Sequence, residues 1–185
     1  MTSKFQQRMN NPLTAWVLVL AWVSAIYGTL YRARPICEFL RSATPLGLII
    51  NVTLLSAAGF IVFFFYKKKA FANPLKIVLF LLVLTVYALS CYFLKQPEER
   101  LHFIEYGLLT LFCFNALRFH FSSKGLYVLS WTLVTIFGYG DEVIQYYLPN
   151  RYFQWKDVGL NSLSAMLAVA LILLIIKPVQ KNNRF

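Results

Sequence analysis

The chain has 185 residues, of which 59% are hydrophobic and only 14% are charged, and its mean hydropathy is +0.60. This length suits one domain, but the composition is too apolar for a domain that faces water, so we exclude a soluble globular protein. The net charge of +11 would suggest nucleic-acid binding in a soluble protein. Here the basic residues lie in short gaps between apolar runs, which is typical of membrane topology signals. We therefore predict a single integral membrane domain over residues 1–185, with no nucleic-acid partner.

Membrane-spanning helices need about 20 mostly apolar residues. Six runs approach this length: Leu13–Tyr31, Leu46–Tyr66, Leu75–Leu94, Leu101–Phe119, Gly125–Tyr147 and Val158–Ile176. Residues typical of loops stand between them, namely Pro35, Pro45, Asn73-Pro74, Pro97, Ser122-Ser123 and Pro149-Asn150. We predict an all-α, polytopic membrane bundle of about six transmembrane helices, with loops at these positions.

The orientation of the bundle is indicated by its basic residues. Of the 18 lysines and arginines, eleven lie on the side of the two termini and seven on the other side. By the positive-inside rule, both termini are expected in the cytoplasm of a multi-pass protein. All seven acids then lie in the half of the protein that faces outward. Acidic residues contribute little to setting the topology, so this segregation is a separate observation.

The last three runs each carry polar residues to the same outer end. These residues are His102, Glu105 and Tyr106 in the fourth run, Asp141, Glu142 and Gln145 in the fifth, and Asp157 and Asn161 in the sixth. Residues three or four apart share a helix face. Three stripes result: Glu98, His102 and Glu105; Gly138, Asp141 and Gln145; and Asp157, Asn161, Ser164 and Ala168. We expect these stripes to face one another and not the lipid.

Several of these polar residues allow two interpretations. Ionisable groups at membrane depth are costly, so Asp141 and Glu142 favour a binding role for a cation or an amine over a structural pair with Arg151. The Arg151 guanidinium either forks onto a phosphate or carboxylate or bridges to Asp157 or Glu142. Asn161 and Gln145 are expected to form interhelical hydrogen bonds.

His102 has the chemistry of a proton-transfer group or a metal ligand, with Glu105 and Glu98 nearby in sequence. A single histidine is more often structural, and no second histidine lies on the same side of the chain, so we predict neither a metal nor a cofactor. If the chain is an enzyme, His102 and Glu142 are the candidate general acids or bases. No disulfide is expected among its three cysteines.

The order of these residues resembles the signature of VanZ-like membrane proteins. The matching elements are HxxEY from His102 to Tyr106, DExxQ from Asp141 to Gln145, Pro149 with Arg151, and finally Asp157 and Asn161. The resemblance covers about residues 97–170. Glu98-Glu99 replaces a frequent Asp-Lys pair, which removes a cation, and Ser164 and Ala168 replace frequent glycines.

The resemblance implies a protein of the bacterial cell envelope and cytoplasmic membrane, because the family's namesake is associated with low-level resistance to the glycopeptide antibiotic teicoplanin. It implies no reaction. We predict membrane lipids as partners. The first hypothesis is recognition of the headgroup of a lipid or lipid-linked cell-wall precursor at the outer leaflet, with His102 taking part. The predicted binding residues are Glu105, Tyr106, Asp141, Glu142, Gln145, Arg151, Asp157 and Asn161.

Two other functions remain open. One is an enzyme that modifies such a lipid, with Arg151 neutralising a phosphate. The other is a proton-coupled transporter, which is disfavoured because the inner half of the bilayer would contain no acid or histidine to continue a path.

Overall fold

A computed structural model describes residues 11–68, 72–121, 125–149 and 151–175, and every regular element in them is a helix. The elements are α2 (Pro12–Ala43), α3 (Leu46–Lys67), α4 (Pro74–Phe93), the short 3₁₀ helix η2 (Pro97–Leu101), α5 (His102–Leu117), α6 (Gly125–Tyr147) and α7 (Trp155–Ile175). The all-α prediction is confirmed for this part of the chain. The two termini, Ser122-Ser123 and Asn150 lie outside the described residues.

Two helices begin with the same sequence signal, an asparagine followed by a proline. The side chains of Asn11 and Asn73 accept hydrogen bonds from the backbone N–H groups of Leu13 at 2.9 Å and Lys76 at 3.3 Å. The following proline needs no hydrogen-bond partner and its fixed φ suits the first helical turn. The loop predicted at Asn73-Pro74 therefore ends at Asn73, which caps α4, and Pro74 is the first residue of that helix.

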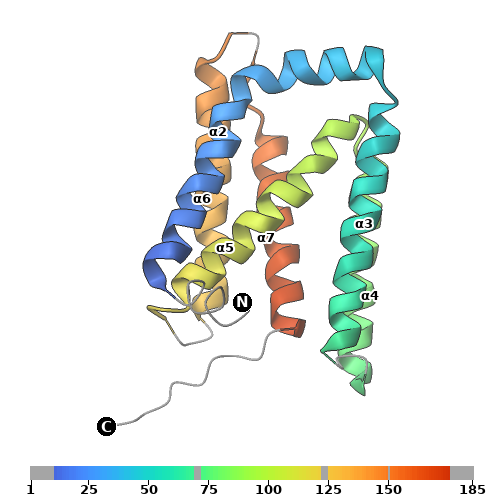
Figure 1. Cartoon of the computed structure of the whole chain (residues 1–185), viewed down its shortest axis with the longest axis vertical. Helices are drawn as coiled ribbons and strands as arrows, with labels where there is room; N and C mark the ends of the chain where they lie inside the picture. Colours follow the sequence, from blue (N-terminus) through green and yellow to red (C-terminus); the bar gives the residue numbers. More distant parts are fainter. Residues whose placement is uncertain (1–10, 69–71, 122–124, 150, 176–185) are drawn as a thin grey trace, which may run out of the picture.

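The loop predicted at Pro35 is wrong, because α2 continues through this residue as far as Ala43. A proline inside a helix removes one backbone hydrogen bond and bends the helix without necessarily ending it. Figure 1 shows the consequence: the second part of α2 turns away from the first and runs across the end of the bundle. Pro35 thus marks a change of direction within one helix.

Among the described residues, four segments are long and apolar enough to cross a membrane: Pro12–Arg32, Leu46–Lys67, Pro74–Phe93 and Trp155–Ile175. The chain is therefore a membrane protein by these features, while the count of six spans stays a prediction. The predicted run from Leu101 is shortened, because η2 precedes an α5 of only 16 residues. The helix α6 is also not among these four segments, and it contains Asp141 and Glu142 near its C-terminal end.

The helices divide into a bundle and a hairpin (Figure 1). In the bundle, α2, α5, α6 and α7 pack against one another around residues such as Val19, Tyr106, Leu109 and Val134. The α3–α4 hairpin stands beside this bundle, and its two helices meet where the rings of Phe65 and Phe80 stack with centroids 4.4 Å apart. It reaches the bundle mainly through contacts of α4 with α7 and of α3 with η2.

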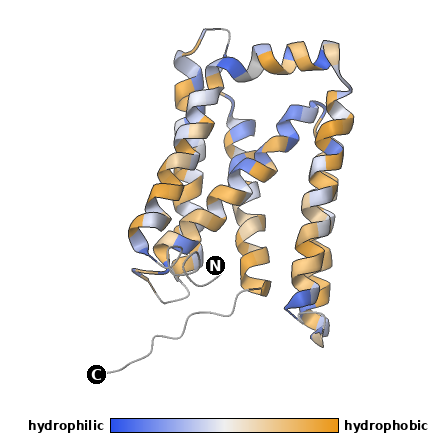
Figure 2. Ribbon diagram, viewed as in Figure 1, coloured by the Kyte–Doolittle hydropathy of each residue, from blue (hydrophilic) through white to orange (hydrophobic). Residues whose placement is uncertain are grey.

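The polar residues of the bundle gather at one end. Figure 2 shows hydrophilic residues at η2 and the start of α5, close to the end where α6 finishes and α7 begins. The middle parts of α3, α4 and α5 are mostly apolar (Figure 2). The structure therefore places the polar ends of α5, α6 and α7 together, as the sequence predicted.

Candidate functional site

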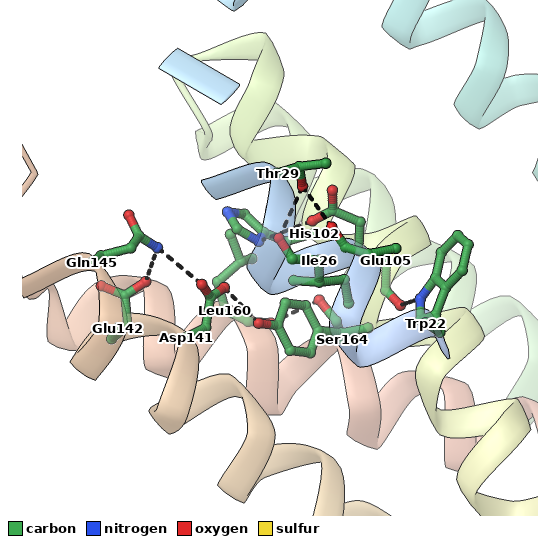
Figure 3. A network of polar contacts seen from close by, with 12 residues as sticks. Trp22, Ile26, Thr29, His102, Glu105, Asp141, Glu142, Gln145, Leu160 and Ser164 are labelled. Carbon is green, nitrogen blue, oxygen red and sulfur yellow. Dashed lines mark hydrogen bonds and ion pairs between the residues drawn. The ribbon is translucent and has the colours of Figure 1, made fainter. Parts of the chain in front are cut away.

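Asp141 and Glu142 lie buried in a hydrogen-bonded network at this end of the bundle (Figure 3). The Tyr106 hydroxyl donates to Asp141 Oδ2 at 2.6 Å. The Gln145 amide Nε2 donates to Glu142 Oε1 at 2.9 Å and to Asp141 Oδ1 at 3.4 Å, and the backbone N–H of Gln154 donates to Glu142 Oε2 at 2.9 Å. Every oxygen of both carboxyl groups accepts a hydrogen bond, which offsets the cost of burying them.

The network depends on helical spacing in α6 and on one residue from α5. Gln145 lies three and four residues after the two acids, so its amide reaches both across one turn. Tyr106 comes from the facing helix and is fully buried. The second predicted stripe, Gly138, Asp141 and Gln145, is buried as expected. The two acids thus fix the positions of Tyr106, Gln145 and the segment that leads into α7.

Arg151 is held beside this network without being neutralised by a carboxylate. Its Nη1 donates to Gln145 Oε1 at 3.3 Å, and its Nη2 donates to the backbone oxygen of Leu30 at 3.1 Å. Among the described residues, the guanidinium forms no ion pair with Asp157 or Glu142, so the bridge that the sequence allowed is not formed. A guanidinium has five N–H donors, and these two bonds leave three for another acceptor.

Asp157 and Asn161 are buried one helical turn apart at the start of α7, and their whole stripe with Ser164 and Ala168 is buried. Asp157 is 9% exposed and Asn161 is 0% exposed. Within the described part of the chain, Asp157 Oδ1 and both Oδ1 and Nδ2 of Asn161 have no hydrogen-bond partner.

The interhelical hydrogen bonds expected from Asn161 and Gln145 are therefore not found. Gln145 bonds to acids of its own helix and to the following loop. Asn161 instead packs against Gly138 and the ring edge of Tyr106: a Cβ atom added at Gly138 would lie 2.7 Å from Asn161 Cβ and 3.3 Å from Tyr106 Cε1. Asn161 therefore lies close to the backbone of Gly138, which has no side chain to offer its amide.

His102 and Glu105 lie next to the network at the start of α5 (Figure 3). The distance from His102 Nδ1 to Glu105 Oε2 is 3.6 Å, longer than a hydrogen bond, and Nδ1 is buried without a hydrogen-bond partner in the described residues. His102 also interacts electrostatically with Asp141 and Asp157. The described residues include no group of three histidines, cysteines or acids placed to hold a metal ion.

Glu98 does not continue the stripe of His102 and Glu105, because it lies in η2, where the backbone follows a 3₁₀ path. Its carboxylate pairs with Arg41 of α2 at 2.5 Å. The next two residues of η2 also reach other helices: Glu99 pairs with Lys156 of α7 at 2.8 Å, and Arg100 donates to Asn51 of α3 at 2.7 Å. The element η2 therefore connects three helices around the site.

The sequence prediction missed the part of α2 that borders the site. The indole of Trp22 donates to the backbone oxygen of Glu105 at 2.9 Å, and the Tyr27 hydroxyl donates to that of Phe137 at 2.6 Å. A signal was available in the buried stripe of Ala15, Val19, Val23, Ile26 and Leu30, whose helical spacing indicates a packed face. No spacing predicts that a backbone oxygen of this helix holds Arg151.

Comparison with known protein families gives one result: residues 97–176 match the VanZ/LLP1 family model. These residues form a VanZ-like domain. The matched region begins at η2 and includes α5, α6 and α7, which supply the acids, Tyr106, His102 and Asn161. No curated protein and no solved structure shows significant similarity to the chain. The match extends over 80 of the 185 residues of this membrane protein, so the similarity to the VanZ/LLP1 family is shown for that part of the chain.

Proposed function

We propose that this VanZ-like protein binds the polar headgroup of a membrane lipid or lipid-linked cell-wall precursor at the end of its bundle. In this proposal it is a multi-pass protein of the bacterial cytoplasmic membrane, with both termini in the cytoplasm and the site at the outer leaflet. The distribution of lysine and arginine supports the orientation. The binding role rests on Arg151.

Arg151 carries the proposal because its guanidinium is positioned by uncharged oxygens. Its partners are an amide oxygen of Gln145 and a backbone oxygen of Leu30. Arg151 interacts electrostatically with Asp141, Glu142 and Asp157 but forms no direct ion pair with them among the described residues, so three of its N–H donors stay available to an anion. Phosphate is the anion common to phospholipids and lipid-linked precursors, and a guanidinium binds its oxygens in a forked geometry.

The acids support this role indirectly. Asp141 and Glu142 hold the Gln145 amide from one side, which leaves Gln145 Oε1 directed at Arg151. A ligand that contacts Arg151 would therefore meet a guanidinium fixed at two points, so that little side-chain entropy is lost on binding.

Native mass spectrometry of the purified protein tests the proposal. We expect the wild type to retain a phosphate-containing lipid and Arg151→Ala to retain much less of it. Arg32→Ala is the matched control, since Arg32 lies on an exposed surface of α2 outside the site, and it should retain the lipid like the wild type. Equal retention by Arg151→Ala and the wild type, or no retained lipid in the wild type, would contradict the proposal.

A link to glycopeptide resistance is suggested by the family's namesake. We propose that expression of the wild type in a teicoplanin-sensitive bacterium raises the inhibitory concentration of teicoplanin, and that Arg151→Ala at equal membrane abundance does not. If both proteins raised the inhibitory concentration equally, resistance would not depend on Arg151.

A further inference from the structure

Three polar atoms of α7 stand out because they are buried and lack a hydrogen-bond partner among the described residues. They are Asp157 Oδ1 and the Oδ1 and Nδ2 atoms of Asn161. The two residues lie four positions apart in α7, so they share one face of the helix. A buried polar group without a partner costs free energy, so a ligand that supplied partners for this pair would bind more tightly.

The surroundings explain why the protein itself does not supply the partners. Asn161 packs against Gly138, where the ring of Tyr106 also lies close, and the Tyr106 hydroxyl already donates its hydrogen bond to Asp141. The oxygens of Asp141 and Glu142 accept from other donors. Gly138 therefore has no side chain to offer Asn161, and the polar groups of Tyr106, Asp141 and Glu142 already form other hydrogen bonds.

The types of the free atoms restrict the chemistry of a ligand. Asp157 Oδ1 and Asn161 Oδ1 accept hydrogen bonds, whereas Asn161 Nδ2 donates them. An ammonium group only donates, so it would leave Asn161 Nδ2 without an acceptor. A phosphate or carboxylate only accepts, and it would be repelled by the Asp157 carboxylate. A hydroxyl group donates one hydrogen bond and accepts others, so it satisfies both kinds of atom.

We infer that Asp157 and Asn161 form a subsite for hydroxyl groups, and that the bound headgroup carries a glycerol or a sugar. The inference rests on the proposed function, because it names the part of the headgroup that lies beyond the phosphate held by Arg151. Hydrogen bonds link Arg151 to Tyr106 through Gln145 and Asp141, and Arg151 interacts electrostatically with Asp157. The result is a site with one place for a phosphate and another for hydroxyls.

The test compares lipids with identical acyl chains by native mass spectrometry of the delipidated protein. Phosphatidylglycerol, phosphatidylethanolamine and phosphatidic acid share a phosphate but differ in the group attached to it. This group carries hydroxyls in phosphatidylglycerol and an ammonium in phosphatidylethanolamine, and it is absent from phosphatidic acid. We expect phosphatidylglycerol to bind about tenfold more tightly than the other two, the equivalent of one good hydrogen bond. Monoglucosyldiacylglycerol against headgroup-free diacylglycerol tests the sugar as the source of the hydroxyls.

Variants assign the preference to the subsite. Asn161→Leu keeps the branching at Cγ and removes the unpartnered polar atoms, so it should lose the preference for hydroxyls; thermal unfolding in detergent checks that it folds. Asp157→Asn should keep phosphatidylglycerol binding and strengthen that of phosphatidic acid, because the repulsive charge is removed. Ser162→Ala is the control: its hydroxyl contacts Trp131 and Thr135, and the preference should persist.

The outcomes separate this inference from the proposed function. If the three phospholipids bind equally, or phosphatidylethanolamine binds best, and the glucolipid gains nothing over diacylglycerol, the hydroxyl subsite is wrong while headgroup binding stands. A preference that survives Asn161→Leu also overturns it. If the wild type binds none of the phospholipids, the proposed function fails and the inference fails with it.

Discussion

The bundle of α2, α5, α6 and α7 and the α3–α4 hairpin are both built from largely apolar helices, but their side chains have different surroundings. In the apolar window of α7, 56% of the residues are buried inside the protein, against 11% in α3 and 11% in α4. Small residues in α6 and α7 allow close contact, and polar side chains bond between elements. The hairpin faces outward with large apolar side chains such as Leu55 and Tyr92.

This difference shows that two kinds of constraint act on one membrane chain. Lipid tails are as apolar as leucine, so the hairpin needs only length and hydrophobicity to be stable in a bilayer. The bundle needs complementary shapes and paired polar groups, because its side chains meet other side chains. Equivalent substitutions should therefore have unequal effects in the two regions.

The largest contrast is expected at two glycines. Gly138→Leu places a side chain where even a Cβ atom would lie 2.7 Å from Asn161 Cβ, so α6 and α7 must separate. We expect a loss of about 3 kcal/mol in the free energy of unfolding. Gly59→Leu on α3 meets nothing within 4 Å and should be neutral or stabilising. Unfolding in mixed detergent micelles measures both variants, and equal losses would abolish the contrast.

A second contrast concerns two tyrosine hydroxyls. Tyr106→Phe removes the buried donor of Asp141, which should cost about 1–3 kcal/mol because a buried carboxyl oxygen loses its partner. Tyr92→Phe on α4 changes a side chain that is 80% exposed and should change the stability little. The same unfolding assay compares them. A neutral Tyr106→Phe would show that the network contributes nothing to folding.

A third prediction asks whether α2 belongs to the bundle energetically. Tyr27→Phe removes a 2.6 Å hydrogen bond to the backbone oxygen of Phe137, and we expect a loss of about 1 kcal/mol. Tyr31→Phe, one turn further along α2 and exposed, is the control. If both variants unfold like the wild type, the hydrogen bond from α2 to α6 is a contact without consequence for stability.

The smallest effect is expected at the rim of the site. The Lys156–Glu99 pair is partly exposed, with 56% of the lysine side chain accessible. A double-mutant cycle with Lys156→Met and Glu99→Gln should give a coupling of less than about 1 kcal/mol, which should weaken as salt is added. A larger coupling that does not depend on salt would mean that η2 is fixed to α7 as firmly as the core is packed.

The sequence predicted some of these features and missed others for identifiable reasons. The start of α4 at Asn73-Pro74 was predictable because its signal is local, and so was the burial of the Asp157 to Ala168 stripe, because helical periodicity defines a face. Pro35 misled the prediction because a proline bends a helix as readily as it ends one. Asn161 misled it because the partners of a side chain depend on which residues of other helices stand opposite.

The sequence by itself determined the all-helical membrane class, the helix starts and the gathering of polar residues at one end. These properties depend on hydrophobicity and spacing within single segments. Only the tertiary structure decided that Arg151 is held by Leu30 and Gln145 instead of a carboxylate, and that Asn161 lies against Gly138 with its amide unpartnered. The physical reason is that such contacts depend on the separation and rotation of neighbouring helices, which no single segment encodes.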